Sequence, residues 1–352
     1  MKPTQMPVVQ RLHGGKPVIT AVPTHPWENK VTFNPACAYV GKGEELERII
    51  AALPFDRPTR HALEAEAGLC FVIYRAQGGK TDEQDHTRST MGLAVLSPDL
   101  RLLARHSTPV LVPEFDYENL GVEDGRLAKV GDRYVLSYTG YRSGKPNNAV
   151  RLALASTRDF VHWEKHGLVN ADFNSLDNKN SMLFEGKIGG KFVMLHRPME
   201  GTDAMCVHWA EADDVFGVWT DRGVLMRPIR NPAFADTWIG GGAPPLKLSH
   251  GRYLLIYHIG NCKADKTKEY DLGIAILDPA LPDPVVKRDE PLIRPTTVPE
   301  TVGDAELGVN NVVFICGAYF HDGFLWFPYA GADSVVLAGR IPLAEIERYA
   351  AT

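Results

Sequence analysis

Long apolar runs, clusters of basic residues and paired cysteines are all missing from this chain of 352 residues. No segment approaches the roughly 18 consecutive apolar residues that a membrane-spanning helix needs. The formal net charge of −5 and the scattered lysines and arginines argue against a nucleic-acid-binding surface. The opening residues, Met1–Pro7, lack the apolar centre of a signal peptide. The sequence therefore favours a cytoplasmic protein that binds neither membranes nor nucleic acid.

Cysteine is scarce, and its spacing carries no pattern. The chain has 5 cysteines and no C-x-x-C pair, so neither a zinc site nor a disulfide framework is indicated. Unpaired cysteines suit a reducing, cytoplasmic compartment. Nothing in the sequence implies a metal or an organic cofactor. The cysteines are Cys37, Cys70, Cys206, Cys262 and Cys316.

Short β-rich segments, in contrast, recur along the whole chain. Each copy has a turn residue, about five mostly apolar or aromatic residues, and then an aromatic or histidine position. The spacings between these last positions are 64, 58, 61 and 72 residues. Such a period suits a four-stranded propeller blade with long loops. We therefore predict an all-β fold, a single five-bladed β-propeller over residues 1–352. The repeated positions are Tyr74, Tyr138, His196, Tyr257 and Tyr329.

One region departs from the β pattern. Residues 44–53 contain helix formers with apolar side chains at the spacing of one helical face, and Pro54 ends the segment. Residues 60–66 add a further helical turn or two. The region, 44–66, is predicted to be inserted between the first two strands of the first blade. It would serve as a flap over the central funnel, as a contact in a homo-oligomer, or as a plain surface helix.

Two neighbouring acids mark the strongest candidate for a site. Gly121–Arg126 contains Glu123 and Asp124 side by side at the end of an apolar step. Because successive side chains of a strand point to opposite faces, only one of the two acids is expected to face a cavity. The matching segments before the other repeats would surround the same funnel. The five segments are Phe33–Ala36, Val122–Asp124, Asn180–Phe184, Gly240–Pro245 and Asn310–Phe314.

Potential cations follow the repeated aromatic position in three of the five blades. They are Arg75, Arg197 and His258. Equivalent positions in a propeller meet at the axis, so these side chains are predicted to form one cationic pocket. In a chain with a net charge of −5, such a convergence favours an anionic ligand.

These motifs, in their order from about Trp27 to Asp333, resemble glycoside hydrolase family 130, the inverting mannoside phosphorylases and related β-mannosidases. The resemblance implies a five-bladed β-propeller, in agreement with the repeats. It rests on Phe33–Ala36, Tyr74–Arg75, Gly121–Arg126, Arg151–Ala155, Met182–Lys187, Met194–Pro198, Gly242–Pro245, Ile256–His258, Tyr270–Gly273, Asn311–Phe314 and Gly331–Asp333.

The resemblance also implies roles for individual residues. Asp124 would be the single catalytic acid, acting in some members through a sugar hydroxyl. Phosphate would be held by Lys187, His258 and Tyr270, with an arginine for which Arg197 and Arg151 are the candidates. The sugar would be held by Asn34, Arg75, Arg88 and Asp333. Glu123 and His196 are further candidates for substrate contacts, although His196 could equally be a core residue.

Two departures from the family pattern matter. Gly125 stands where a proline is common, and Glu185 stands one position earlier than the usual glutamate. A carboxylate there could repel phosphate or activate water. We predict a phosphorylase that uses inorganic phosphate to cleave a β-mannoside oligosaccharide with inversion, releasing α-D-mannose 1-phosphate. The alternatives are a β-mannosidase on the same fold and a non-catalytic carbohydrate-binding propeller.

Overall fold

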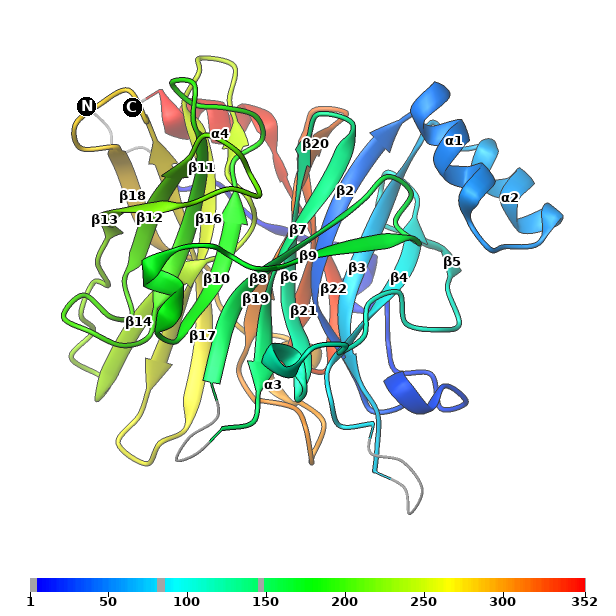
Figure 1. Cartoon of the computed structure of the whole chain (residues 1–352), viewed down its shortest axis with the longest axis horizontal. Coiled ribbons are helices and arrows are strands. Elements are labelled where there is room, and N and C mark those ends of the chain that lie inside the picture. Colours follow the sequence, from blue (N-terminus) through cyan, green and yellow to red (C-terminus); the bar gives the residue numbers. More distant parts are fainter. Residues whose placement is uncertain (1–4, 81–85, 145–148, 352) are drawn as a thin grey trace.

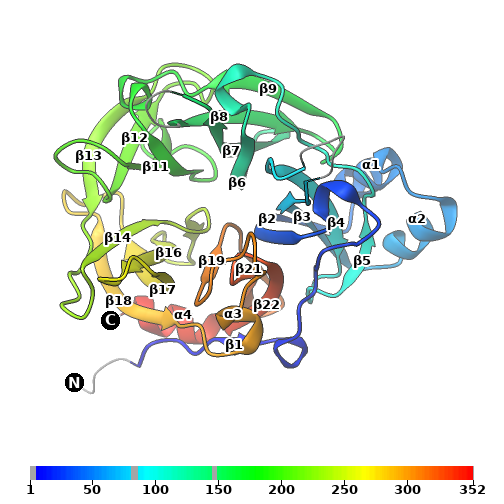
Figure 2. The same ribbon diagram turned by 90° about the horizontal axis from the view of Figure 1, so that it is seen from below.

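A computed structural model describes residues 5–80, 86–144 and 149–351. Its strands form five antiparallel sheets, which surround a central axis like the blades of a propeller (Figures 1 and 2). The predicted five-bladed architecture is confirmed. In each sheet the first strand of the blade lies innermost and the chain then runs outward by antiparallel pairing. The start of every blade therefore faces the axis.

The blades consist of the following strands. The first blade has β2 (Val31–Gly41), β3 (Gly68–Gln77), β4 (Thr90–Leu96) and β5 (Leu102–Arg105). The second has β6 (Gly121–Val130), β7 (Arg133–Arg142), β8 (Ala149–Thr157) and β9 (Trp163–Leu168). The third has β10 (Asn178–Leu183), β11 (Phe192–Pro198), β12 (Val207–Ala212) and β13 (Thr220–Met226).

The last two blades each carry an additional short strand. The fourth has β14 (Asp236–Gly241), β15 (Leu246–Lys247), β16 (Tyr253–Cys262), β17 (Lys268–Leu277) and β18 (Val285–Ile293). The fifth has β19 (Val313–Ile315), β20 (Tyr319–His321), β21 (Phe324–Gly331), β22 (Val335–Pro342) and the N-terminal β1 (Gln10–Arg11). Because β1 pairs with β22, the beginning of the chain completes the last blade and closes the ring.

Helices are few and short. The α-helices are α1 (Glu44–Ala52), α2 (Arg57–Glu64), α3 (Val298–Thr301) and α4 (Leu343–Ala350). Single 3-10 turns are η1 (His13–Gly15), η2 (Pro26–Glu28), η3 (Asp116–Glu118) and η4 (Asp172–Ser175). No helix in the described part of the chain is long and apolar enough to cross a membrane.

The sequence repeat corresponds to the second strand of each blade, and its aromatic position anchors the blade. In four blades a buried tyrosine hydroxyl donates to a glutamate at 2.6–2.9 Å. The same glutamate pairs with an arginine or lysine from the outermost strand of that blade. We call this arrangement the tyrosine–glutamate–cation triad. The triads are Tyr74–Glu28–Arg105, Tyr138–Glu118–Lys165, Tyr257–Glu290–Arg288 and Tyr329–Glu300–Arg11.

The predicted helical insertion forms α1 and α2, between β2 and β3. Leu46, Ile49 and Ile50 of α1 are buried in the core cluster shared by the first two blades. Glu45 accepts hydrogen bonds from Tyr134 and Lys129 of the second blade. The insertion is thus fixed to the outside of the ring, where Figures 1 and 2 show both helices.

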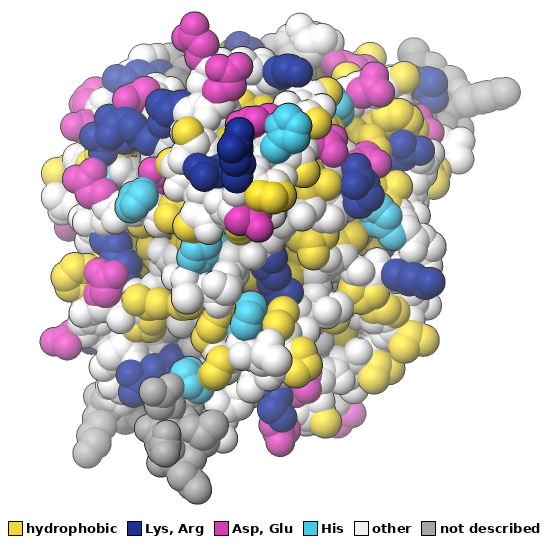
Figure 3. Space-filling view, turned by 90° about the vertical axis from the view of Figure 1, so that its right-hand side faces the viewer, with side chains coloured by type: hydrophobic (Ala, Val, Ile, Leu, Met, Phe, Trp, Pro, Cys, Tyr) yellow, Lys and Arg dark blue, Asp and Glu magenta, His cyan; other side chains and the backbone are white. Residues whose placement is uncertain are grey.

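The insertion lies at the opposite end of β2 from the residue Asn34, which the sequence places in the predicted site. It follows the end of β2 at Gly41, whereas the site residue Asn34 lies near the beginning of that strand. Seven residues of extended chain span about 23 Å. The prediction that the insertion forms a flap over the predicted site is therefore wrong. A role of the insertion as a contact in a homo-oligomer stays a prediction. On the face that carries α1 and α2, acidic and basic side chains are interspersed (Figure 3).

Candidate active site

Three innermost strands share a break in register close to their beginning. The breaks lie between Phe33 and Ala36 in β2, between Glu123 and Arg126 in β6, and between Lys179 and Met182 in β10. Each bulge contains one residue with positive φ, namely Asn34 (46°), Asp124 (51°) and Asn180 (59°). Asparagine and aspartate tolerate this conformation better than other side chains, and a bulge re-aims the side chain it carries.

The bulged residues line one cavity of about 200 Å³. We call the wall that contains Asp124 and Asp333 its acidic side, and the wall that contains Arg197, His258 and Tyr270 its cationic side. Strands of all five blades or the loops before them contribute to its wall. The lining residues are Asn34, Arg75, Asp124, Lys179, Asn180, Arg197, His258, Lys268, Tyr270, Val309, Val312, Phe314 and Asp333.

Only one of the two neighbouring acids lines the cavity, as expected, although the bulge brings both to one guanidinium. One guanidinium, that of Arg75, contacts both acids, through Nη2 to Glu123 Oε1 at 2.6 Å and through Nη1 to Asp124 Oδ1 at 3.1 Å. Lys179 Nζ contacts Glu123 Oε2 at 3.2 Å. Glu123 is therefore a buried partner of two cations, and only Asp124 of the pair lines the cavity.

Asp124 is held by several polar groups at once. Asn34 Nδ2 donates to its Oδ1 at 2.7 Å, and Arg126 Nη1 donates to its backbone carbonyl at 2.7 Å. The other nitrogens of Arg126 donate to the carbonyls of Gly241 and Gly242, so this buried arginine connects two blades. Burial opposes ionisation of Asp124, but the charges of Arg75, Lys179 and Arg126 outweigh it and lower its pKa. Asp124 is therefore ionised at neutral pH.

A second carboxyl of the cavity, Asp333, behaves in the opposite way. Burial raises its pKa to about 7, and the charges of Asp124 and Glu123 add to this rise against the attraction of Arg75. Two like charges in one cavity cannot both ionise at low cost. Asp333 is accordingly the carboxyl that keeps a proton near neutral pH.

This pKa gives a stability prediction. A carboxyl whose pKa rises on folding from 3.8 to about 7 stabilises the folded state when protonated, and loses that contribution as pH rises through 7. Asp333→Asn should therefore melt about 2–5 °C above the wild type at pH 8. At pH 5 the gap should shrink, which thermal denaturation at the two pH values would measure. The control Asp322→Asn, at an exposed position, should have the melting temperature of the wild type at both pH values. An equal difference between Asp333→Asn and the wild type at pH 5 and pH 8 would contradict the raised pKa of Asp333.

The cationic side of the cavity contains an arginine without a counter-ion. Arg197 is only 6% exposed, and no carboxylate among the described residues lies within ion-pair distance of it. Its Nη1 donates to His258 Nε2 at 3.1 Å, while its Nε has no hydrogen-bond partner. Burial lowers the pKa of Arg197 to about 10. The positive charge of Arg197 is therefore not balanced by a carboxylate on this side of the cavity.

His258 and Tyr270 complete the same side. Burial, followed by the charges of Arg197 and Arg126, keeps the pKa of His258 well below its usual value, so its imidazole is neutral. Because Nε2 accepts from Arg197, the proton of the ring is on Nδ1, on the side of the ring that interacts with the backbone of Gly241. Burial also raises the pKa of Tyr270 to about 12, so its hydroxyl remains a donor. Arg197 and Tyr270 thus provide donors for an anion in this part of the cavity.

Four predicted site residues lie elsewhere. Lys187 is exposed in the turn after β10, and its Nζ donates to the carbonyl of Asp213 at 3.0 Å. Arg151 pairs with Asp177 and donates to the carbonyl of Ser175. Arg88 is exposed and does not line the cavity. Their predicted places with the phosphate or the sugar are wrong. Lys187 follows the far end of β10, and the guanidinium of Arg151 is bound to Asp177 and to the carbonyl of Ser175, none of which lines the cavity.

His196 is also outside the cavity. Its ring is 1% exposed and stacks on Phe173 with 4.0 Å between ring centroids. Burial lowers its pKa. Of the two interpretations left open by the sequence, the structure supports the core histidine.

Glu185, the candidate base for water, faces another cavity. It lines that space with Tyr39, Lys129 and Tyr134. Lys129 lies five residues beyond Asp124 on β6, which is about 16 Å along an extended strand. Glu185 therefore does not contribute a carboxylate to the catalytic cavity.

The position of Lys187 leads to a direct test. Lys187→Ala should leave the KM for phosphate within about twofold of the wild type, since exposed side chains remote from a ligand contribute little to its binding. Initial rates measured over a range of phosphate concentrations would check this. Lys179→Ala, which removes a cation that lines the cavity, should impair the enzyme in the same assay. A large rise in KM for phosphate in Lys187→Ala would contradict the placement.

The sequence did not reveal Lys179 and Lys268 as cavity residues, and it indicated Asn180 only as the first residue of a segment that surrounds the funnel. A signal for Lys179 and Asn180 was present, because the segment before the third repeat aligns with those before the first two. In that alignment Asn180 matches Asn34 and Asp124, and Lys179 matches Glu123. Lys268 begins β17, and nothing local indicates that a third strand reaches the cavity.

Comparison with known proteins adds to this geometry. A model of glycoside hydrolase family 130, described as β-1,4-mannooligosaccharide phosphorylase, matches residues 68–350. The chain belongs to this family. A 1,2-β-oligomannan phosphorylase from Thermoanaerobacter sp. (strain X514) is 30% identical over 94% of this chain and 97% of its own length. A β-1,2-mannobiose phosphorylase from the same organism is 31% identical over 95% of each chain.

A solved structure has the same fold as the present chain. It is β-1,2-mannobiose phosphorylase from Listeria innocua in complex with β-1,2-mannobiose, with a TM-score of 0.75 and 22% identity. The alignment covers 96% of the present chain and 98% of the other. At this level of identity the likeness concerns the propeller, and the chemistry has to be argued from the cavity itself.

Proposed function

We propose that this family 130 protein is an inverting phosphorylase that transfers a mannosyl unit from a β-mannoside to inorganic phosphate. The observation that carries the proposal is the buried Arg197 without a counter-ion, beside the imidazole of His258 and the hydroxyl of Tyr270. An unpaired buried charge is costly unless a ligand compensates it. A phosphate anion would accept charge-assisted hydrogen bonds from these groups.

The opposite side of the cavity suits the sugar. Asn34 and Arg75 orient Asp124, and Asp333 adds a carboxyl near the same guanidinium. We propose that Asn34, Arg75 and Asp333 hold the mannosyl unit between Asp124 and the cationic side. A phosphate oxygen then forms a bond to C1 while the bond from C1 to the glycosidic oxygen breaks on the opposite face. The products are α-D-mannose 1-phosphate and the shortened saccharide, whose new hydroxyl takes up a proton.

Asp124 is the proposed source of that proton. The neighbouring cations of the protein keep its pKa low. Bound phosphate brings negative charge opposite Asp124, and the bound sugar removes water; both effects raise the pKa of a carboxyl. The two carboxyls of the cavity also interact, so the proton near neutral pH belongs to the pair Asp124 and Asp333. Protonation of the acid is therefore linked to the binding of both substrates.

Hydrolysis on the same fold is the alternative, and one observation weighs against it. An inverting hydrolase needs a carboxylate on the far side of the sugar with room for water. Cations stand on that side here, and Glu185 lines a different cavity. A propeller that only binds carbohydrate would not require a buried cationic group opposite an acid.

We further propose a β-1,2-linked mannoside as the substrate. The two similar curated proteins are named for β-1,2-mannosides and cover nearly the whole chain, whereas the family description refers to the β-1,4 linkage. The free cysteines support a reducing, cytoplasmic setting.

One assay tests the proposal. The protein is incubated with β-1,2-mannobiose or β-1,4-mannobiose, with and without inorganic phosphate, and mannose and mannose 1-phosphate are quantified. We expect α-D-mannose 1-phosphate from β-1,2-mannobiose in the presence of phosphate, and no cleavage in its absence. Release of free mannose without phosphate would establish hydrolysis instead. Turnover of β-1,4-mannobiose alone would overturn the linkage and leave the phosphorylase proposal intact.

A further inference from the structure

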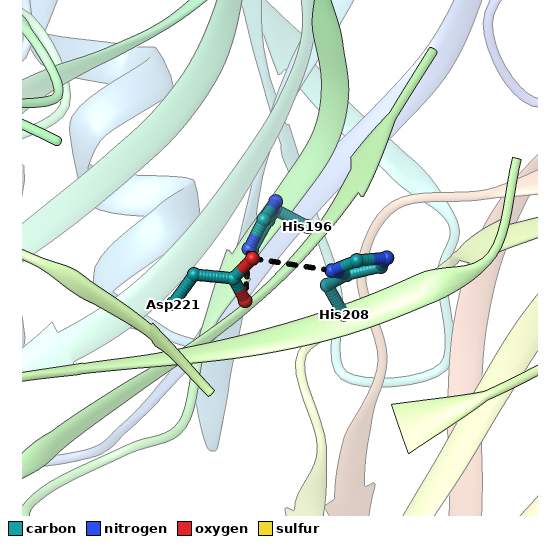
Figure 4. Close-up of side chains that lie close together, drawn as sticks. All are labelled: His196, His208 and Asp221. Atoms are coloured by element: carbon teal, nitrogen blue, oxygen red, sulfur yellow. Dashed lines mark hydrogen bonds and ion pairs between the residues drawn. The ribbon is translucent and has the colours of Figure 1, made fainter. Parts of the chain in front are cut away.

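The third blade lacks the tyrosine–glutamate–cation triad that anchors the other four. His196 on β11 occupies the place of the tyrosine, and Asp221 on the outermost strand β13 supplies the carboxylate. No lysine or arginine among the described residues pairs with Asp221. A second histidine, His208 on β12, lies there instead (Figure 4). In this blade the acid is retained, but the cation of the triad is absent.

We propose that His196, His208 and Asp221 bind a divalent metal ion, with Zn²⁺ as the best match, which takes the place of the missing cation. Imidazole and carboxylate are ordinary zinc ligands at about 2.0–2.2 Å, so neighbouring ligand atoms of a tetrahedral site lie about 3.4 Å apart. His196 Nε2 lies 3.6 Å from Asp221 Oδ1, and His208 Nδ1 lies 3.3 Å from Asp221 Oδ2. All three ligand atoms lie within 4.8 Å of one another.

The hydrogen bonds of His208 favour a metal ligand. Its Nε2 lies 3.0 Å from the carbonyl of Asp203, which can only accept, so Nε2 carries a proton. Nδ1, the other ring nitrogen, faces Asp221 Oδ2 at 3.3 Å. A cation between these two atoms would bind both of them. Donation of the second ring nitrogen to a backbone carbonyl is also the usual support of a metal-binding histidine.

The surroundings of His196 agree with this role. Its Nε2 is buried and has no hydrogen-bond partner, and the same is true of Asn178 Oδ1. The Asn178 amide contacts His196 Nδ1 at 3.0 Å. If the amide is turned, Oδ1 accepts from Nδ1–H and the lone pair of Nε2 is directed toward Asp221. The turn gives up the 3.4 Å hydrogen bond from Asn178 Nδ2 to the carbonyl of Phe173.

The three ligands lie on three adjacent strands of one sheet. His196 and His208 are directly opposite each other in the β11–β12 pairing, and a metal would add a bond to β13. The side chain of Asp221 is 34% exposed, so an ion can enter and a water can complete the coordination. The proposed role is structural, the same anchoring of the outer strands that the triads provide in the other blades.

Metal content and melting temperature test the proposal. Tag-free protein is stripped with a chelator, equilibrated with Zn²⁺, passed through a desalting column and analysed for metal per chain. We expect one Zn²⁺ per chain and a rise in Tm of about 3 °C at a hundredfold excess over Kd. Mg²⁺, which prefers oxygen ligands, should produce neither effect.

Two variants and one control make the test specific. His208→Ala and the nearly isosteric Asp221→Asn should weaken Zn²⁺ binding at least about 100-fold, since loss of supporting groups alone costs 10–100-fold. His162→Ala, which removes an exposed histidine paired with Asp159, should bind Zn²⁺ like the wild type. Circular dichroism verifies that each variant is folded. No bound Zn²⁺ in the wild type, or equal binding in all four proteins, would overturn the proposal and leave a His–Asp–His hydrogen-bond network.

Discussion

Arg197→Met is expected to raise the KM for phosphate by at least about tenfold, because a hydrogen bond to a charged group contributes about 1.5–3 kcal/mol. The same substitution should not destabilise the phosphate-free protein. Methionine has a similar length and no charge, and replacing an unpaired buried charge by an apolar side chain is neutral or stabilising. Phosphate should raise the Tm of the wild type and leave that of the variant unchanged. Thermal denaturation with and without phosphate would measure both effects.

Arg151→Met provides the matched control. Arg151 was the other candidate for the phosphate arginine, but it is paired with Asp177 outside the cavity. Its loss leaves Asp177 without its partner, so the Tm should fall while the KM for phosphate stays within about twofold of the wild type. The two arginines should therefore show opposite behaviour. If phosphate still stabilises Arg197→Met as it does the wild type, the anion site lies elsewhere.

The number of blades could be predicted from the sequence because each blade repeats one buried anchor. Tyr74, Tyr138, Tyr257 and Tyr329 each need a carboxylate partner, so the position tolerates little change and is visible as a repeat. The same regularity explains why Arg75, Arg197 and His258 could be grouped before the structure was known. They follow the anchor by one residue in their blades, and equivalent positions converge on the cavity.

Other features depend on backbone geometry that local sequence does not reveal. Strand alternation separated Glu123 from Asp124, but the bulge between Glu123 and Arg126 brings both to Arg75. The ring is closed by β1, which has only two residues and no visible strand pattern. The proposed metal ligands are 12 and 13 residues apart, and only the pairing of β11, β12 and β13 brings them together.

Lys187 illustrates the limit of transferring roles along a motif. The residues from Met182 to Lys187 resemble a family pattern, yet the site end of β10 is its beginning, with Lys179 and Asn180. A motif that covers a whole strand includes residues at both ends of that strand. Only one end of β10 reaches the cavity, so Lys187 can match the family pattern and still lie far from the phosphate.

Asp124→Asn is expected to reduce kcat at least about 100-fold, the smaller end of the range for general acid catalysis. The substitution retains Oδ1, so the hydrogen bonds from Asn34 and Arg75 can persist and the cavity should keep its shape. The KM for phosphate should change much less than kcat, because the phosphate donors are on the other side of the cavity. Steady-state kinetics of mannobiose phosphorolysis would separate the two parameters.

A substrate with a better leaving group tests whether the missing function is proton donation. An aryl β-mannoside with a weakly basic phenolate departs without a proton, so its cleavage should be impaired far less in Asp124→Asn than that of mannobiose. The exposed Asp132→Asn, a neighbour in sequence paired with Arg158, should retain wild-type rates on both substrates. An equal loss on the two substrates would assign Asp124 to binding or orientation. In that case another carboxyl would have to donate the proton. Glu123 is bound to Arg75 and does not line the cavity, so Asp333 would be the candidate.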